Sequence, residues 1–375
     1  MIYLVLIILL CVCWYISACV VQQRNKQGYN FIYCESEPYW GNDVYKPLFI
    51  FAVFLLILLV GLRKVNIGWD TVQYYASFNK LKTFETIQDV INYKLSGGTT
   101  MEWAFVFYTW VIGKIGTFEL FNIVSVALYI IPIAIYIYRY SENKFLSLFL
   151  FTTFGLYIFA FSTIRQSIAM GICFLAIIYG SEKNKPVRYF LLVTLAVLFH
   201  RTALIFVPSY FYNKLRINRI TAAAIAILAV LFYRFRSVIL TFLLGFARNT
   251  GSSVETGGLF QYLFVVGVVL LGIYLMRYWN VESFEKNRMK FLFICQSIVL
   301  VILPILRVSP TYFRLYYYNY MFMVVYVPNI LAYIPDRNIR RIAKMFLFLL
   351  GSYLFYKQIV HTTNPLLPYY FFWQN

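Results

Sequence analysis

Two arginines and a glutamine occupy positions at which a membrane protein could bind a phosphate group. Arg165 and Gln166 begin an apolar segment, and Arg314 lies at another such boundary, two residues after Tyr312. A guanidinium group binds phosphate oxygens through two parallel hydrogen bonds, and neighbouring tyrosine rings can stack on sugars. These residue types therefore indicate binding of a phosphorylated saccharide. The alternative is structural, because arginines at helix ends also extend to the membrane surface and tyrosines form interfacial belts.

Asp70 and His200 are the residues that could remove a proton from an attacking hydroxyl group. The chain has only 14 acidic residues and 2 histidines among 375 residues. Asp70 follows an apolar run that ends at Leu62, and His200 interrupts the apolar run 189–212. Carboxylates and imidazoles are common general bases. The alternatives are an interfacial loop around Asp70 and a hydrogen-bonded structural histidine, and either residue remains a candidate for the base.

The sequence lacks the common motifs of metal and nucleotide sites. It contains no DxD pair, no P-loop, no HExxH motif and no CxxC pair. The 6 cysteines lie mostly in apolar segments, where cysteine ordinarily serves as a small core residue. We therefore expect no metal and no cofactor, and a leaving group whose charge is neutralised by arginines.

The composition is typical of a polytopic membrane protein. Hydrophobic residues make up 62% of the chain, charged residues 13%, and the mean hydropathy is +0.71. A soluble domain of this length could not bury so much apolar surface. The first apolar run lacks a basic start and a small-residue cleavage site, which predicts a retained membrane segment. The net charge of +19 is then expected to reflect orientation and anionic lipid headgroups rather than nucleic acid.

About ten segments are apolar enough to be full membrane spans. They cover 2–21, 47–62, 118–138, 145–163, 164–180, 220–246, 259–276, 291–306, 312–334 and 345–360. Segment 101–116 is patchily apolar and resembles an interfacial amphipathic helix, and 189–212 is either one span or a re-entrant hairpin. Arg234 and Arg236 fall inside a predicted span, where cations are costly and often functional. We expect an all-α protein with about 10–12 transmembrane helices. Residues 1–375 would form a single polytopic domain, in which 63–117 is an outer-face loop with an amphipathic helix.

Basic connections predict how these spans are oriented. The densest ones are 213–219, 277–290 and 336–344, which we expect in the cytoplasm. Counting from them places Asp70, Arg165, His200 and Arg314 at or near one outer face, provided that 101–116 and 189–212 do not cross fully. If both crossed, Arg165 would move to the other side.

These motifs resemble the EpsG family of bacterial polysaccharide polymerases, which are Wzy-like proteins. The matching pieces are Arg63…Gly68-x-Asp70-x-x-x-Tyr74, Arg165-Gln166, Phe199-His200-Arg201-Thr202-Ala203-Leu204 and Tyr312-Phe313-Arg314. Together they extend over most of the chain. Two pieces depart from the family pattern. The family's acidic-Pro-Gly-aromatic stretch is Thr100-Met101-Glu102-Trp103 here, and an arginine follows His200 where the family has a small hydroxyl residue.

The resemblance implies a GT-C-like glycosyltransferase in the bacterial inner membrane. Such an enzyme transfers a growing glycan from undecaprenyl diphosphate to the end of a lipid-linked repeat unit on the outer face. It implies Asp70 or His200 as the catalytic base, and substrate binding by Arg63, Tyr74, Arg165, Gln166, Tyr312 and Arg314. The implied partners are the undecaprenyl-diphosphate-linked oligosaccharide and membrane lipid. A chain-length regulator and a flippase are further candidates, and nucleic acid is not.

Three other functions share parts of this pattern. A lipid-linked oligosaccharide flippase would need no base and should have two related halves, whereas this sequence has no internal repeat. A membrane acyltransferase could use His200, although the type with an early His-Arg motif is excluded because no histidine precedes position 200. An O-antigen ligase generally has a large late outer loop, and the late outer loops predicted at 248–258 and 307–310 are short. The polymerase is therefore the preferred interpretation.

Overall fold

The protein is an all-α bundle. The computed structural model describes residues 2–26, 45–215, 217, 219–239, 241, 259–276, 283–306, 314–360 and 366–374. Among these residues the one extended pairing is an isolated antiparallel bridge between Arg63 and Phe371. The helices up to the middle of the chain are α1 (Ile2–Lys26), α2 (Lys46–Gly61), α3 (Thr71–Lys82), α4 (Ile87–Leu95), α5 (Trp103–Ile115), α6 (Phe118–Tyr140), α7 (Lys144–Thr153), α8 (Leu156–Ser162), α9 (Ile164–Ala176) and the π-helical turn η1 (Ile177–Ser181). The remaining ones are α10 (Pro186–Phe199), the 3₁₀ helix η2 (Arg201–Lys214), α11 (Arg219–Arg234), α13 (Leu259–Leu275), α14 (Ser283–Leu306), η4 (Arg314–Tyr316), α16 (Tyr317–Tyr320), α17 (Met323–Ala332) and α18 (Arg337–Val360).

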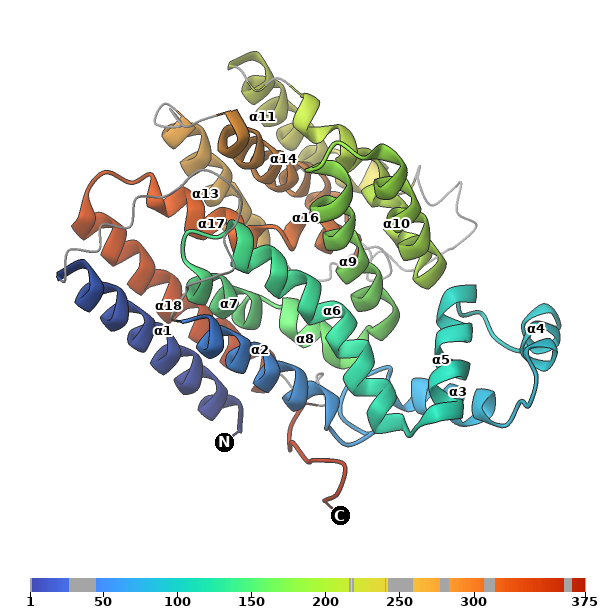
Figure 1. Cartoon of the computed structure of the whole chain (residues 1–375). Coiled ribbons are helices and arrows are strands. Elements are labelled where there is room, and N and C mark those ends of the chain that lie inside the picture. Colours follow the sequence, from blue (N-terminus) through green and yellow to red (C-terminus); the bar gives the residue numbers. More distant parts are fainter. Residues whose placement is uncertain are drawn as a thin grey trace.

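The centre of the bundle is α6, which packs against α2 on one side and α9 on another (Figure 1). Gly171 of α9 permits this close approach, because any side chain at that position would collide with the backbone of Leu128. Aromatic rings fill the rest of the core. The ring of Phe174 lies 5.2 Å from that of Tyr136 and 4.8 Å from that of Phe322. Such pairs contribute about 0.5–1.5 kcal/mol beyond the burial of their area.

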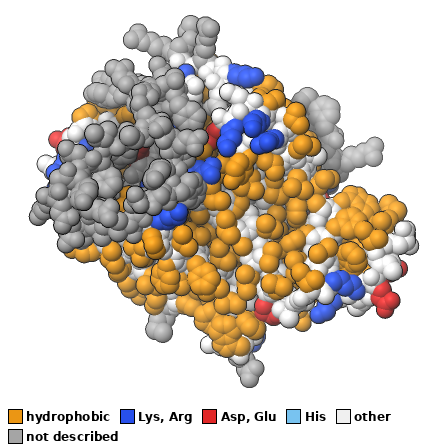
Figure 2. Space-filling model, in the orientation of Figure 1, with side chains coloured by type: hydrophobic (Ala, Val, Ile, Leu, Met, Phe, Trp, Pro, Cys, Tyr) orange, Lys and Arg blue, Asp and Glu red, His pale blue; other side chains and the backbone are white. Residues whose placement is uncertain are grey.

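Three helices in the described part of the chain are long and apolar enough to cross a membrane unaided. They comprise residues 118–140, 164–181 and 287–304 and coincide with three predicted spans. Hydrophobic side chains also cover most of the described surface in Figure 2, as expected for a protein in contact with lipid. The other apolar helical stretches are 10–17 residues long. The prediction of about ten full spans is thus confirmed only for these three helices, and the GT-C-like architecture stays a prediction.

Several predicted spans differ from the helices that form. Segment 145–163 is two helices, α7 and α8, bent by 49°. The break falls at Gly155, whose φ of +91° is a left-handed conformation that favours glycine. Segment 312–334 is likewise divided, within its described part, among η4, α16 and α17. In the predicted span 220–246, α11 ends at Arg234, whose side chain is exposed at the protein surface, and Arg236 is half-buried; the position of these cations within a span stays a prediction.

Segment 189–212 forms a hairpin with His200 at its tip. Tyr189, early in α10, donates a hydrogen bond to the carbonyl oxygen of Phe206 in η2 at 2.7 Å. Asn213 at the end of η2 contacts Ser181 of η1 at 3.5 Å. Both ends of the hairpin therefore lie at the end of the bundle where η1 finishes. The segment is therefore a hairpin and not one continuous span, and whether this hairpin is re-entrant in the membrane stays a prediction.

Region 63–117, predicted as a loop with one amphipathic helix, contains three helices. α3, α4 and α5 form a small lobe beside the start of α6, at the right of Figure 1. Its core consists of Leu81, Val90 and Val106. Thr86 and Asp89 form a capping box that starts α4. The helix predicted at 101–116 is α5.

The end of the bundle opposite His200 is joined by polar contacts. The hydroxyl group of Tyr140 donates a hydrogen bond to Glu182, and the guanidinium group of Arg288 lies 4.6 Å from the centroid of the Tyr140 ring. Asn329 donates to the carbonyl oxygen of Tyr140 at 2.8 Å. Burial raises the pKa of Glu182 to about 7, although Tyr140 and nearby cations oppose this shift. These contacts tie α6, η1, α14 and α17 together.

Candidate functional site

The loop of residues 63–70, here called the Asp70 loop, is shaped by a buried arginine. The Arg63 side chain is 1% exposed. Its four hydrogen bonds go to the carbonyl oxygens of Ile67 (3.1 Å), Val60 (2.6 Å) and Phe161 (3.1 Å) and to the hydroxyl oxygen of Thr71 (3.4 Å). These donors are directed into the protein, so the observed arrangement gives Arg63 a structural role, and its predicted binding of substrate stays a prediction. Arg63 fixes the loop against α8.

Gly68 turns the chain so that Asp70 can begin α3. Its φ is +102°, and a side chain there would collide with the backbone of Phe161. The next amide, that of Trp69, donates a hydrogen bond to the hydroxyl oxygen of Ser162 at 3.1 Å. The Asp70 loop is thus attached to the end of α8, only a few residues before Arg165. This attachment brings two distant parts of the sequence together.

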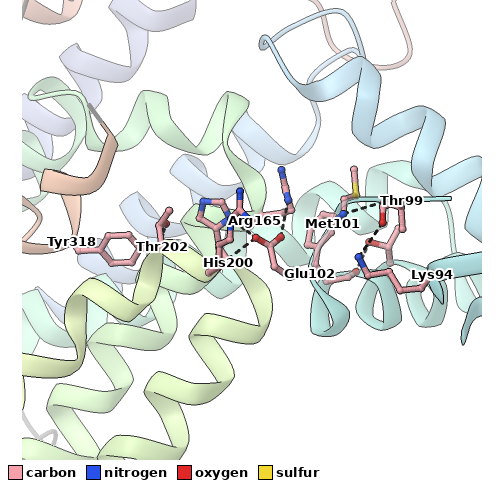
Figure 3. Close-up of polar contacts among 11 residues, drawn as sticks. Lys94, Thr99, Met101, Glu102, Arg165, His200, Thr202 and Tyr318 are labelled. Carbon is pink, nitrogen blue, oxygen red and sulfur yellow. Dashed lines mark hydrogen bonds and ion pairs between the residues drawn. The ribbon is translucent and has the colours of Figure 1, made fainter. Parts of the chain in front are cut away.

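Glu102 is the centre of the site, and sequence reasoning did not select it. It precedes α5 with an extended backbone (φ −68°, ψ 153°) and makes no capping hydrogen bond, so its carboxylate turns towards α9 and α10. Arg165 Nη1 donates to Glu102 Oε2 at 2.7 Å. His200 Nδ1 lies 3.1 Å from Glu102 Oε1, which also accepts from the backbone amide of Arg201 at 3.2 Å. Figure 3 shows the carboxylate between the arginine and the imidazole. These four residues are called the Glu102 cluster.

Glu102 is ionised at neutral pH. Burial alone would raise the pKa of its carboxyl group, but the hydrogen bond with His200 and the charge of Arg165 outweigh burial and lower this pKa to about 2. An ionised carboxylate accepts hydrogen bonds only. His200 Nδ1 must then carry the proton that it shares with Glu102, which leaves Nε2 as the nitrogen that can accept another proton.

The two departures from the family motifs have a structural explanation. Arg201 contributes its backbone amide, which any residue except proline could supply, and its side chain is exposed. The next residue, Thr202, carries a hydroxyl group, which is hydrogen-bonded to the Tyr318 hydroxyl at 3.1 Å. Glu102 stands at the third position of the altered motif, two residues after the place of the family's acidic residue, and supplies a carboxylate there. The altered motif was therefore the signal that could have identified this residue.

Tyr74 and Gln166 lie beside the cluster. Tyr74 is 4% exposed and packs on Phe105, with their ring centroids 5.5 Å apart. Burial raises the pKa of the Tyr74 phenol, and the neighbouring Arg165 partly offsets this. Gln166 is 4% exposed and donates a hydrogen bond to the carbonyl oxygen of Arg314 at 3.0 Å. Gln166 therefore connects the start of α9 to η4.

Asp70 and Arg314 form a looser and more accessible pair. Arg314 Nη1 lies 3.8 Å from Asp70 Oδ2, and their side chains are 44% and 31% exposed. At this distance the pair is a weak, solvent-screened contact rather than a fixed salt bridge. Glu102, in contrast, is 14% exposed. The site thus has one tight arginine–carboxylate pair and one that can open.

Most of the predicted site residues converge here. Asp70, Tyr74, Arg165, Gln166, His200 and Arg314 come from α3 and its loop, α9, the α10–η2 hairpin and η4. Tyr312 lies outside the described residues. The sequence predicted one carboxylate at the site, Asp70, and the structure adds Glu102. Asp70 pairs with Arg314, and Glu102 pairs with Arg165. In the part of the chain that the structure describes, no three His, Cys, Asp or Glu side chains gather as metal ligands. Metal independence stays a prediction.

Comparison with known proteins gives one match. A family model described as the EpsG family matches residues 46–371, which include every residue of the site from Asp70 to Arg314. No curated protein and no solved structure matches the chain.

Proposed function

Since the chain belongs to the EpsG family of Wzy-like polysaccharide polymerases, we propose that it joins lipid-linked repeat units on the outer side of the bacterial inner membrane. The donor is a growing glycan on undecaprenyl diphosphate, and the acceptor is the terminal sugar of another lipid-linked unit. The observation that carries this proposal is the convergence of two arginines, two carboxylates and a histidine at one end of an apolar bundle.

In the proposed reaction His200 is the general base. Its Nε2 takes the proton of the acceptor hydroxyl as the oxygen forms a bond to the anomeric carbon of the donor. The bond between that carbon and the diphosphate breaks through an oxocarbenium-like state. Glu102 holds the imidazole in the tautomer and direction that this step requires. Asp70 was an equal candidate for the base in the sequence, but His200 is the one held by a buried, ionised partner.

The arginines stabilise the departing diphosphate. Arg165 uses Nη1 for Glu102, and its side chain is 26% exposed, so part of the guanidinium group remains open to an anion. Arg314 is exposed enough to leave Asp70 for a stronger anion. Fixed donors directed at the charge that develops in a transition state typically accelerate reactions about 10²–10³-fold per donor. Tyr74 and Gln166 maintain the positions of these two groups.

The arrangement of basic residues supports the outer placement of the site. The end of the bundle opposite His200 carries Arg139, Lys183, Lys214 and Arg288 near the contacts of Glu182 and Ser181. Cytoplasmic connections are enriched in such residues. The Glu102 cluster then faces outward, where lipid-linked repeat units are presented after export.

The test is complementation of a strain that lacks this chain, with Arg165→Lys, Arg314→Lys and His200→Gln. Lysine keeps the charge and loses the planar fork, and glutamine in place of His200 removes the nitrogen that accepts the proton. We expect single repeat units at the cell surface and no ladder of longer chains for each variant, since export would be intact. Loss of even the single repeat would mean a block in transport and would favour the flippase. A normal ladder in all three variants would contradict the proposed site.

A further inference from the structure

The C-terminal strap, residues 366–374, is fixed to the start of the Asp70 loop. The backbone amide of Lys64 donates a hydrogen bond to the carbonyl oxygen of Tyr370 at 3.0 Å. The backbone amide of Phe372 donates one to the carbonyl oxygen of Leu62 at 2.9 Å. Tyr3 anchors the strap from the other side by donating to the carbonyl oxygen of Leu366 at 3.2 Å. The N and C labels accordingly lie near each other in Figure 1. The start of α1, residues 62–64 and the C-terminal strap thus meet beside the C-terminal end of α2.

The strap has a buried side and an exposed aromatic side. Leu366 is fully buried, whereas Trp373 is 58%, Phe372 43% and Tyr370 38% exposed. Phe371 and Trp373 form a parallel stack with ring centroids 4.5 Å apart and planes 5° apart. Trp373 is therefore held in a defined orientation while much of its surface is open.

The strap is connected to the Asp70 loop through residues 62–64. Arg63, which pairs with Phe371 through the backbone bridge, also donates to Thr71, the residue after Asp70. Trp69, one residue before Asp70, is itself 51% exposed. The Lys64 ammonium lies 5.8 Å from the centroid of the Tyr370 ring. The strap and the start of the Asp70 loop therefore present open aromatic rings beside a cation, and Trp69 adds another exposed ring farther along the loop.

We propose that the exposed aromatic side of the strap binds the saccharide of a lipid-linked substrate and holds it beside the Asp70 loop. This proposal rests on the proposed polymerase function. Sugar rings have apolar faces that pack on flat aromatic surfaces, and their hydroxyl groups remain available to water. The strap residues carry no charged side chain, so they contribute surface rather than electrostatic attraction. Lys64 supplies a positive charge at the edge, suited to a saccharide that is joined to phosphate.

The competing explanation is that these rings anchor the protein at the membrane interface, where Trp and Tyr are common. An anchor has no need of backbone pairing to a loop of the site. The strap pairs with residues 62–64, which follow the last turn of α2, and this pairing couples its position to that of Asp70. The two explanations differ in whether Trp373 faces saccharide or lipid.

The experiment measures the surroundings of Trp373 directly. The full chain, labelled with 5-fluorotryptophan, is placed in nanodiscs of phosphatidylethanolamine and phosphatidylglycerol, and Trp373→Phe assigns its ¹⁹F resonance. The probe is polysaccharide from the producing strain, freed of lipid by mild acid. We expect a saturable shift of the Trp373 resonance and none for Trp110, which is hydrogen-bonded to Phe84 inside the lobe. Tyr370→Ala should weaken this binding about 3–10-fold, the range for one lost aromatic contact.

The proposal is overturned if the Trp373 resonance does not respond to polysaccharide. If headgroup spin-labelled lipid broadens that resonance in the same experiment, Trp373 is a membrane anchor. His200→Ala should abolish chain extension and keep the polysaccharide response. Normal polymerisation by Arg165→Lys would instead reject the proposed mechanism and leave the binding result unaffected, so the two failures are distinguishable.

Discussion

Replacing Glu102 with glutamine removes the charge at the centre of the site and keeps its shape. Glu102 Oε1 accepts from His200 and Arg201, and Oε2 accepts from Arg165 at 2.7 Å. In Glu102→Gln one of these oxygens becomes an NH₂ group, which can only donate. If the NH₂ group replaces Oε2, it faces the guanidinium donor. If it replaces Oε1, it faces the two N–H groups.

Either orientation loses at least one hydrogen bond between charged or strongly polar partners. Bonds to charged groups contribute about 1.5–3 kcal/mol, and about 1.4 kcal/mol corresponds to a tenfold change in rate. We therefore expect Glu102→Gln to lower the kcat of chain extension by about 10–100-fold. Glu102→Asp keeps the charge on a shorter side chain and should retain more activity than glutamine.

The assay is polymer formation by membrane vesicles supplied with lipid-linked repeat units, with initial rates measured over a range of unit concentrations. Glu85→Gln is the matched control, because Glu85 is an exposed acid of the same lobe. If Glu102 acts through His200, the double variant with His200→Gln should be little slower than His200→Gln alone. Wild-type kcat for Glu102→Gln, or fully additive losses in the double variant, would refute this reasoning.

Three further outcomes are expected. Arg63→Lys should lower the Tm measured in detergent, because a buried acceptor left unpaired costs about 1–3 kcal/mol; unchanged Tm with lost substrate binding would support a direct role for Arg63. Polymerisation should survive EDTA, and activity lost to the chelator and restored by Mg²⁺ would contradict neutralisation by arginines. The pKa of Glu182 is raised from 4.5 to about 7, so its contribution to stability is complete below about pH 4.5 and is lost as the pH rises through about 7. Tm should therefore fall between about pH 5 and 8, and Glu182→Gln should flatten this fall; an unchanged slope would contradict the assignment.

The sequence predicted which residues meet at the site better than it predicted their surroundings. Asp70, Arg165, His200 and Arg314 all follow or precede apolar segments, and such positions gather at the ends of a bundle. Glu102 was missed because it stands in an altered motif. The burial of Arg63 was not predicted, because residue spacing does not show side-chain direction. The turn at Gly68, which brings the loop against Phe161, folds Arg63 inward.

The number of spans was harder to predict for a physical reason. Hydropathy and length identify apolar segments, but they do not show whether a segment is straight. Segment 145–163 is apolar throughout and still bends by 49° beside Gly155. Segment 189–212 is long enough to cross and instead returns, so that Tyr189 meets Phe206. Breaks of this kind depend on contacts with other helices, such as those of η2 with α14 and α16, which no local pattern contains.

The unequal strength of the two arginine–carboxylate pairs suits them to different parts of the reaction. Two arginines directed at one diphosphate would repel each other in the empty site, and each carboxylate reduces that cost. Arg165 is held at 2.7 Å from a buried partner and should keep that partner when substrate binds. Arg314 lies 3.8 Å from an accessible one and can exchange it for phosphate oxygens. The exchange would leave Asp70 without its cation only while diphosphate is bound. In the proposed mechanism Arg314 would then sense the donor, while Glu102 would keep His200 and Arg165 in place throughout the cycle.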